Sequence, residues 1–134
     1  MDKYQKLLKS HNMKSTHQRL SILNCIDNFC HIDIDFLYDK LLKKSPSLSK
    51  ATLYRNINDL IASSIIEEVK LPNLKQQYEL KKAPHIHLLC KNCDNVKDLN
   101  IDLDSFNNYI SNNSDFKVEK SFIVIKGLCH NCSM

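Results

Sequence analysis

The sequence predicts an α+β protein with two parts: a helical N-terminal domain that ends in a β-hairpin, and a small C-terminal α/β domain. Two observations lead to this prediction. Apolar residues recur at helical spacing from Tyr4 to Ile61 and then occur in short, strand-like runs. Two Cys-x-x-Cys pairs lie in the last third of the 134 residues, where they can hold a small domain together.

Four helices are expected in the N-terminal part. Thr16 is a plausible cap for the second helix, and Ser49 is one for the fourth, which spans residues 50–64 after a turn at Pro46. The apolar positions of the four helices are Tyr4, Leu7 and Leu8; Leu20, Leu23 and Ile26; Ile34, Leu37 and Leu41; and Leu53, Ile57, Leu60 and Ile61.

A β-hairpin should follow the helices, with strands at residues 65–71 and 76–80 around the turn "PNLK". Helices followed by a hairpin describe a winged helix-turn-helix domain, and the fourth helix occupies the place of its recognition helix. Tyr54, Arg55 and Asn58 fall away from the apolar stripe of that helix, toward solvent or a partner.

The pattern changes after Pro84. Alternation predicts strands at residues 85–90 and 95–100, a helix around Leu103, Phe106 and Ile110, and a long strand over 116–129. We therefore expect a winged-helix domain at residues 1–80, a hinge at 81–84, and a second domain at 85–134.

Composition limits the cellular setting and the partners. The net charge of +4 permits nucleic-acid binding, and the basic excess lies in the first 82 residues. No apolar run reaches the roughly 18 residues that a membrane span needs. The N-terminus lacks the apolar segment of a signal peptide. We therefore expect a cytoplasmic protein that does not interact with a membrane.

The cysteines predict a structural zinc site. Cys90–Cys93 and Cys129–Cys132 are separated by 35 residues, and four thiolates form the tetrahedral set that structural zinc prefers. A domain of some 50 residues has a small core, so a metal staple makes physical sense. A thioredoxin-like redox pair is the rival interpretation, but that motif works alone and opens a helix. Cys25 and Cys30 are expected to be buried free thiols.

The histidines suggest a second metal site. His85 and His87 share one strand face and cannot both join the four cysteines around zinc. Glu79, Asp98 and His31 are the candidate additional ligands. Imidazole and carboxylate together suit Fe(II), Mn(II) or Zn(II) better than a soft metal. Because these residues come from both halves of the chain, a bound metal would fix how the two halves are oriented.

The sequence closely resembles the ferric uptake regulator (Fur) family of bacterial metal-dependent repressors. The matching stretches are "THQRLSIL", "HIDIDFLYDKL", "SLSKATLYRNINDL", "YEL", "HIHLLCKNC", "KDL" and "GLCHNC". The resemblance implies a homodimer whose second domain dimerises. It also implies structural Zn²⁺ on the four cysteines, Fe²⁺ or Mn²⁺ on the five-ligand site, and DNA contacts from Tyr54 and Arg55.

Within this family the sequence is most like the peroxide-sensing PerR branch. Asp98 is typical of that branch, whereas Glu79 is often Asp there, so the match is mixed. Pro84 and Ile86 replace two members of a further metal site that iron sensors often carry. A PerR-like repressor implies that iron-catalysed oxidation strikes His31 or His85. The alternatives are an iron-responsive Fur-type repressor and a sensor of another metal.

The DNA target implied is an AT-rich inverted repeat in double-stranded DNA. Lys14 and Lys50 would neutralise phosphates, although a solvated face explains these lysines equally well. Three other classes of protein are alternatives: a zinc enzyme, for which no His-Glu-x-x-His signature is present, a zinc-ribbon interaction module, and a thiol switch at Cys90 and Cys93. We expect no enzymatic activity. At two positions the sequence departs from the family pattern, with His17 in place of Pro and Ser64 in place of Gly.

Overall fold

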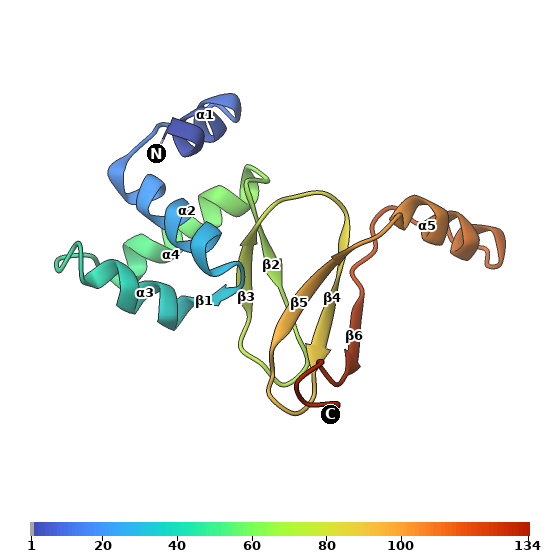
Figure 1. Cartoon of the computed structure of the whole chain (residues 1–134). Helices are drawn as coiled ribbons and strands as arrows, with labels where there is room; N and C mark the ends of the chain where they lie inside the picture. The colour runs from blue at the N-terminus through green and yellow to red at the C-terminus, as the bar shows by residue number, and fades with distance from the viewer. Residues whose placement is uncertain (1) are drawn as a thin grey trace. The chain divides into compact units, whose positions relative to one another are not determined.

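The computed structural model describes residues 2–134, and the chain divides into two compact units, Met1–Lys81 and Lys82–Met134. The first unit contains four helices and a small sheet (Figure 1). Its helices are α1 (Asp2–Ser10), α2 (His17–Phe29), α3 (Ile34–Leu42) and α4 (Lys50–Ala62). The four expected helices are therefore all present. No helix within residues 2–134 is long and apolar enough to cross a membrane.

Side chains cap the helices where the sequence suggested. Thr16 accepts a hydrogen bond from the backbone N–H of Arg19 at the start of α2, and Ser49 accepts one from Thr52 at the start of α4. Asp33 caps α3 in the same way, through the N–H of Phe36. Such caps satisfy amides that the first helical turn leaves without partners.

The end of α4 is a Schellman motif. Ser64 donates its N–H to the carbonyl of Ile61, and Ile65 donates to Leu60. Ser64 has φ 61°, in the left-handed region where glycine is favoured. Helix α4 thus ends at Ala62, two residues earlier than expected, because Ser64 reverses the chain and sends buried Ile65 into the core.

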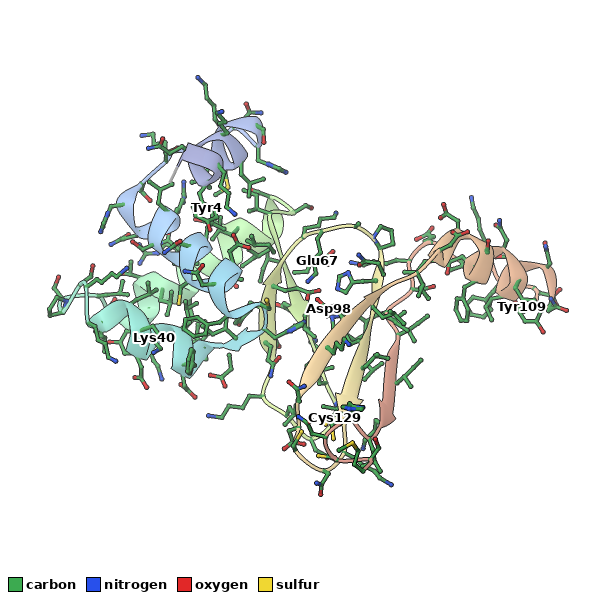
Figure 2. All side chains as sticks on the ribbon, viewed as in Figure 1. Tyr4, Lys40, Glu67, Asp98, Tyr109 and Cys129 are labelled. Atoms are coloured by element: carbon green, nitrogen blue, oxygen red, sulfur yellow. The ribbon has the colours of Figure 1, made fainter. Side chains whose placement is uncertain are left out.

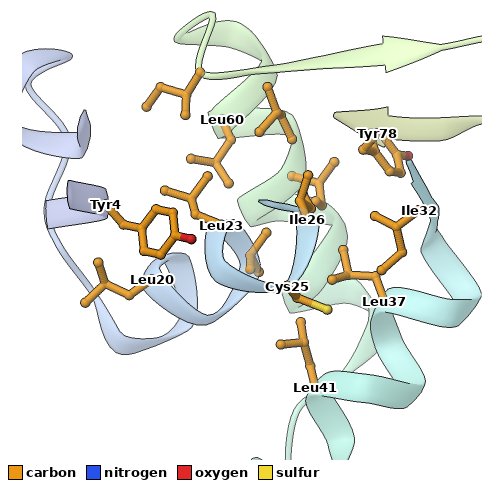
Figure 3. Close-up of a cluster of buried hydrophobic side chains, with 14 of the residues drawn as sticks. Tyr4, Leu20, Leu23, Cys25, Ile26, Ile32, Leu37, Leu41, Leu60 and Tyr78 are labelled. Atoms are coloured by element: carbon orange, nitrogen blue, oxygen red, sulfur yellow. The ribbon is translucent and has the colours of Figure 1, made fainter. Parts of the chain in front are cut away.

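The helices of the first unit pack around one hydrophobic core (Figure 3). Leu23 and Ile26 from α2, Leu37 from α3, and Leu53 and Ile57 from α4 have no measurable exposure. Each buried aliphatic side chain of this size contributes about 1.5–3 kcal/mol. This packing fixes α4 in the unit and leaves the opposite side of the helix in solvent.

The small sheet of the first unit has the strand order β1-β3-β2. The strands β2 (Ile66–Val69) and β3 (Gln77–Leu80) form the expected antiparallel hairpin. The two-residue strand β1 (Ile32–Asp33) was not predicted, since it is too short to show a period. It pairs with β3 and ties the start of α3 to the hairpin.

The second unit is a three-stranded sheet with one helix. Strands β4 (His85–Cys90), β5 (Val96–Asn100) and β6 (Val124–Gly127) have the order β5-β4-β6, and α5 (Leu103–Asn112) connects β5 to β6. The β4–β5 pair is antiparallel and the β4–β6 pair is parallel. The mixed helix and strand content confirms the predicted fold class.

The long strand expected over residues 116–129 is wrong in its extent, because β6 covers only Val124–Gly127. A strand needs a partner, and β4 pairs with β6 only from His87 to Cys90. Before β6 the chain bonds back to α5 instead, where Val118 N–H donates to the Ser111 hydroxyl. A second correction concerns Cys30, which is exposed at the end of α2 and not buried.

Candidate functional site

The four paired cysteines lie together at one end of the second unit. Cys90 ends β4, Cys93 lies in the turn that follows, and Cys129 and Cys132 come shortly after β6. Cys129 is labelled in Figure 2. Their sulfur atoms all lie within 4.8 Å of one another. Four sulfurs at about 2.3 Å from a tetrahedral zinc are about 3.8 Å apart, and the Cys93 and Cys129 sulfurs are 3.8 Å apart. The cluster therefore fits a zinc ion.

The parallel register of β4 and β6 creates this cluster. Cys90 pairs with Gly127, so the chain leaves β6 beside the end of β4 and turns back through Cys129 and Cys132. All six cysteines of the chain are free thiols. An arrangement of four converging thiols, and not two isolated pairs, distinguishes a metal site from a thioredoxin-like redox pair.

Without metal, the thiols of the cluster hold their protons unequally. Bonds from the backbone of Cys129 and Cys93 lower the pKa of the Cys90 thiol to about 6. The pKa of the Cys93 thiol is raised to about 11, where the neighbouring Cys90 sulfur and burial oppose ionisation. The Asn92 amide donates a hydrogen bond to the Cys132 sulfur over 3.3 Å. Zinc binds thiolates, and groups that donate to the sulfurs tune such sites. The sequence had not drawn attention to Asn92.

In the first unit, a histidine and a carboxylate face each other across two antiparallel strands. Ile32 pairs with Tyr78, so His31 comes opposite Glu79. The His31 Nε2 lies 2.9 Å from a Glu79 carboxylate oxygen. The Glu79 side chain is 2% exposed and that of His31 is 9% exposed. Buried charged groups are costly unless they are paired or bound to metal, which marks this pair as a candidate ligand pair.

The second unit contains a similar pair. His87 on β4 is the direct cross-strand neighbour of Asp98 on β5, and the two side chains are 3.7 Å apart at their nearest polar atoms. The His87 side chain is 3% exposed. Lys82 forms an ion pair with the same Asp98 carboxylate. The unit therefore holds its carboxylate between an imidazole and an ammonium group.

His85 lies beside this second pair. Its ring contacts the ring of His87 at a centroid distance of 4.8 Å, so the alternation of β4 places both histidines on one face. The Nδ1 atom of His85 lies 2.9 Å from the carbonyl oxygen of Ala83. A hydrogen bond from Nδ1 to that carbonyl would leave Nε2 as the atom able to bind a metal.

The exposed side of α4 carries the predicted DNA-contact residues of that helix. Lys50, Arg55 and Asn58 are exposed, and Tyr54 is 42% exposed. Core packing alone does not account for Tyr54, because this residue lies outside the buried core and is 42% exposed. Lys14 is also exposed, in the segment between α1 and α2.

A pocket of about 340 Å³ opens between the N-termini of α2 and α4, next to this surface. It is lined by polar side chains that include Thr16, Ser47, Ser49 and Thr52. Helix N-termini carry partial positive charge and unpaired amides, which attract phosphate groups. The first unit thus presents a surface whose chemistry suits a nucleic-acid backbone.

Two charged residues near this surface were not among the predicted site residues. Asp35 on α3 forms ion pairs with Lys50 and with Lys75, which lies in the loop between β2 and β3. Sequence spacing gave no sign of this cluster, because its three members belong to separate elements.

Comparison with known proteins gives consistent results. A model of the ferric uptake regulator family matches residues 10–126. The peroxide operon regulator of Bacillus subtilis is 28% identical over 128 residues, which cover 94% of this chain and 88% of that protein. The ferric uptake regulation protein of the same organism is 26% identical over 140 residues, with 99% and 94% covered.

Solved structures agree with these sequence matches. The Campylobacter jejuni peroxide stress regulator superimposes with a TM-score of 0.76 at 30% identity, covering 95% of this chain and 97% of that one. Regulators solved with zinc, iron or manganese share the fold at 18–23% identity, with TM-scores of 0.70–0.72.

Proposed function

This chain belongs to the ferric uptake regulator family, and on that premise we propose that it is a homodimeric, metal-dependent DNA-binding repressor that responds to peroxide. Membership makes it a metal-responsive transcriptional regulator and not an enzyme. Zinc, iron and manganese are the metals of its structural neighbours. The observation that carries the proposal is the pair of histidine–carboxylate contacts, His31–Glu79 and His87–Asp98, one in each unit.

Two classes of metal are assigned to two sets of ligands. Cys90, Cys93, Cys129 and Cys132 hold structural zinc, because their sulfur spacing matches a tetrahedral thiolate site. His31, Glu79, His85, His87 and Asp98 hold the regulatory metal. Mixed imidazole and carboxylate ligands favour Fe(II) or Mn(II) for this second role.

The regulatory metal would control the conformation of the protein. Its ligands come from both sides of the boundary at Lys81, so binding restricts the orientation of the winged-helix unit relative to the second unit. In the dimer, two α4 helices could then reach successive major grooves about 34 Å apart. This spacing predicts that the operator is an inverted repeat, and we propose that it is AT-rich.

The DNA contacts follow from the exposed face of the first unit. Lys14 and Lys50 would neutralise phosphates, Arg55 and Asn58 would contact the major groove, and the Tyr54 ring would pack against a thymine methyl. Because phosphate contacts release counterions, binding should weaken steeply as salt is raised. A repressor with this surface works in the cytoplasm, where the DNA is.

The second unit supplies the surface for dimerisation. Helix α5 has no buried residue, and its aromatic side chains Phe106 and Tyr109 are 41% and 65% exposed (Figure 2). Phe116 and Phe122 are also exposed on the same unit. Several exposed aromatic residues on one small unit are typical of an interface between subunits.

In peroxide sensing, a histidine ligand of the regulatory site would itself be oxidised. Iron bound there would activate hydrogen peroxide, which is the oxidant, and the chain would supply the group that is oxidised. One oxygen atom of hydrogen peroxide would be inserted into a ring C–H bond of His31 or His85, and the other would leave as water. An oxidised imidazole is a poor ligand, so the metal and the DNA are released.

The test begins with zinc-containing dimer loaded anaerobically with Fe(II). A small excess of hydrogen peroxide is added, and the peptides carrying His31, His85 and His87 are read by mass spectrometry. A gel shift on an AT-rich inverted repeat runs in parallel, with Mn(II)-loaded protein as the control. The proposal expects one added oxygen on His31 or His85, together with DNA release, in the Fe(II) sample only.

Two outcomes would change the assignment. Unmodified histidines with Fe(II)-dependent DNA binding would place the protein with the iron-responsive regulators, which it resembles almost as closely. DNA release from Mn(II)-loaded protein at the same rate would contradict a histidine-oxidation mechanism. Loss of zinc that a reductant reverses would instead point to a thiol switch.

A further inference from the structure

Three charged side chains from three elements meet at the start of α4. The Lys50 Nζ lies 2.9 Å from one carboxylate oxygen of Asp35, and the Lys75 Nζ lies 2.6 Å from the other. Asp35 is on the first turn of α3, Lys50 is the first residue of α4, and Lys75 is in the β2–β3 loop. All three side chains remain at least 44% exposed. The cluster is therefore open to an external anion.

The cluster borders the face of α4 that carries Tyr54. Lys50 and Tyr54 are one helical turn apart on α4, and both are exposed. Lys75 extends the same basic region onto the hairpin loop. Two lysines from two elements thus flank the start of the helix that is proposed to enter the major groove, and one carboxylate binds both.

We propose that Asp35 limits the affinity of this protein for DNA by competing with backbone phosphate for Lys50 and Lys75. The inference rests on the proposed DNA-binding function. With Asp35 ionised the cluster has a net charge of +1, and without it the charge is +2. A carboxylate and a phosphate both offer paired anionic oxygens to an ammonium group, so one can take the place of the other.

Asp35 is ionised at any pH at which the protein works. The hydrogen bonds from Lys75 and Lys50 hold the pKa of its carboxyl at about 2. Exposed ion pairs of this kind are weak and exchange readily with other ions. The carboxylate can therefore weaken phosphate binding without preventing it. Phosphate contacts carry the sequence-independent part of the affinity, which is the part that Asp35 would restrain.

The test compares Asp35→Asn with wild type, both zinc-loaded and supplied with Mn(II). Binding to a mixed-sequence duplex of about 40 base pairs is followed by fluorescence anisotropy from about 50 to about 200 mM salt. Asp35→Asn should bind more tightly at every salt concentration. Its plot of log affinity against log salt should be steeper by about 0.9 per chain, which adds a roughly 3.5-fold loss of affinity per chain over that range.

Two controls separate this role from simpler ones. Asp39→Asn, one turn further along α3 at another exposed position, makes the same change in net charge and should leave binding close to wild type. In a Lys50→Gln, Lys75→Gln background, Asp35→Asn should have no effect, because the competition has been removed. Circular-dichroism melts monitor folding, and Asp35→Ser replaces the Asn variant if that variant melts below the assay temperature.

The proposal is overturned if Asp35→Asn binds as wild type does or more weakly, since a purely structural role would weaken binding. It is equally overturned if Asp39→Asn has the same effect, or if the effect persists without the two lysines. Wild-type protein that fails to bind any DNA with Mn(II) present would reject the proposed function itself. Failure of the inference alone would leave wild-type binding intact.

Discussion

Replacing Cys132 with serine should unfold the second unit and leave the first unit folded. Besides Cys90, the buried apolar side chains of the second unit are Ile86 and Leu89, at 5% and 3% exposure. Two such side chains contribute about 3–6 kcal/mol together. Binding of structural zinc to a four-ligand site contributes about 10–16 kcal/mol at neutral pH. Zinc bound at the cysteine cluster would therefore supply more of the stability of this unit than its core does.

The assay combines three measurements on Cys132→Ser and on a Cys30→Ser control. Zinc content is measured by a colorimetric chelator, thermal unfolding by calorimetry, and amide protection of β4 to β6 by hydrogen exchange. Cys132→Ser should lose zinc, lose protection in the sheet, and keep the transition of the first unit, whose core includes α2 and α4. Cys30 is exposed and lies outside the cluster, so Cys30→Ser should match wild type.

A Cys132→Ser variant that loses its zinc but keeps a protected β4–β6 sheet would contradict this prediction. That result would mean that the sheet, or the dimer it forms, is stable without metal. The core of the second unit would then contribute more than about 3–6 kcal/mol, and the larger contribution of about 10–16 kcal/mol from zinc would not be needed for folding.

Three further predictions concern single residues. Ser64→Gly should stabilise the first unit by about 1 kcal/mol, because glycine adopts the left-handed backbone conformation of this position without strain. Calorimetry should then show a melting temperature about 4–8 °C higher. An unchanged melting temperature would argue against strain at that turn. Lys82→Gln should tighten Mn(II) binding severalfold in a calorimetric titration, because Lys82 no longer competes for Asp98, whereas Lys81→Gln should not. Asn92→Ala should speed transfer of zinc to a chelator, since the Cys132 sulfur loses a hydrogen bond; equal rates would show that Asn92 does not tune the site.

Local features of the sequence predicted most of the elements. Apolar spacing located the four helices of the first unit, and Thr16 and Ser49 were recognised as caps because capping depends on residues three positions away. The length of the strand predicted over 116–129 was overestimated because strand length depends on pairing with distant residues. Its alternation shows that the segment suits a strand, but only the limited pairing of β4 decides how much of it becomes one.

By itself, the sequence determined which chemistry the protein can perform. The thiols at Cys-x-x-Cys spacing, the two histidines on one face of β4, and the tyrosine and arginine on the outer face of α4 are properties of residue type and local period. The position of Ser64 after α4 is likewise a matter of local backbone preference.

Tertiary structure alone decided which distant residues meet. The parallel register of β4 and β6 brings Cys129 to Cys90, and antiparallel pairing sets His87 against Asp98. The packing of α3, α4 and the hairpin brings Asp35 between two lysines from separate elements. Contacts of this kind depend on strand register and helix packing, which are set by the whole core and cannot be read from local spacing.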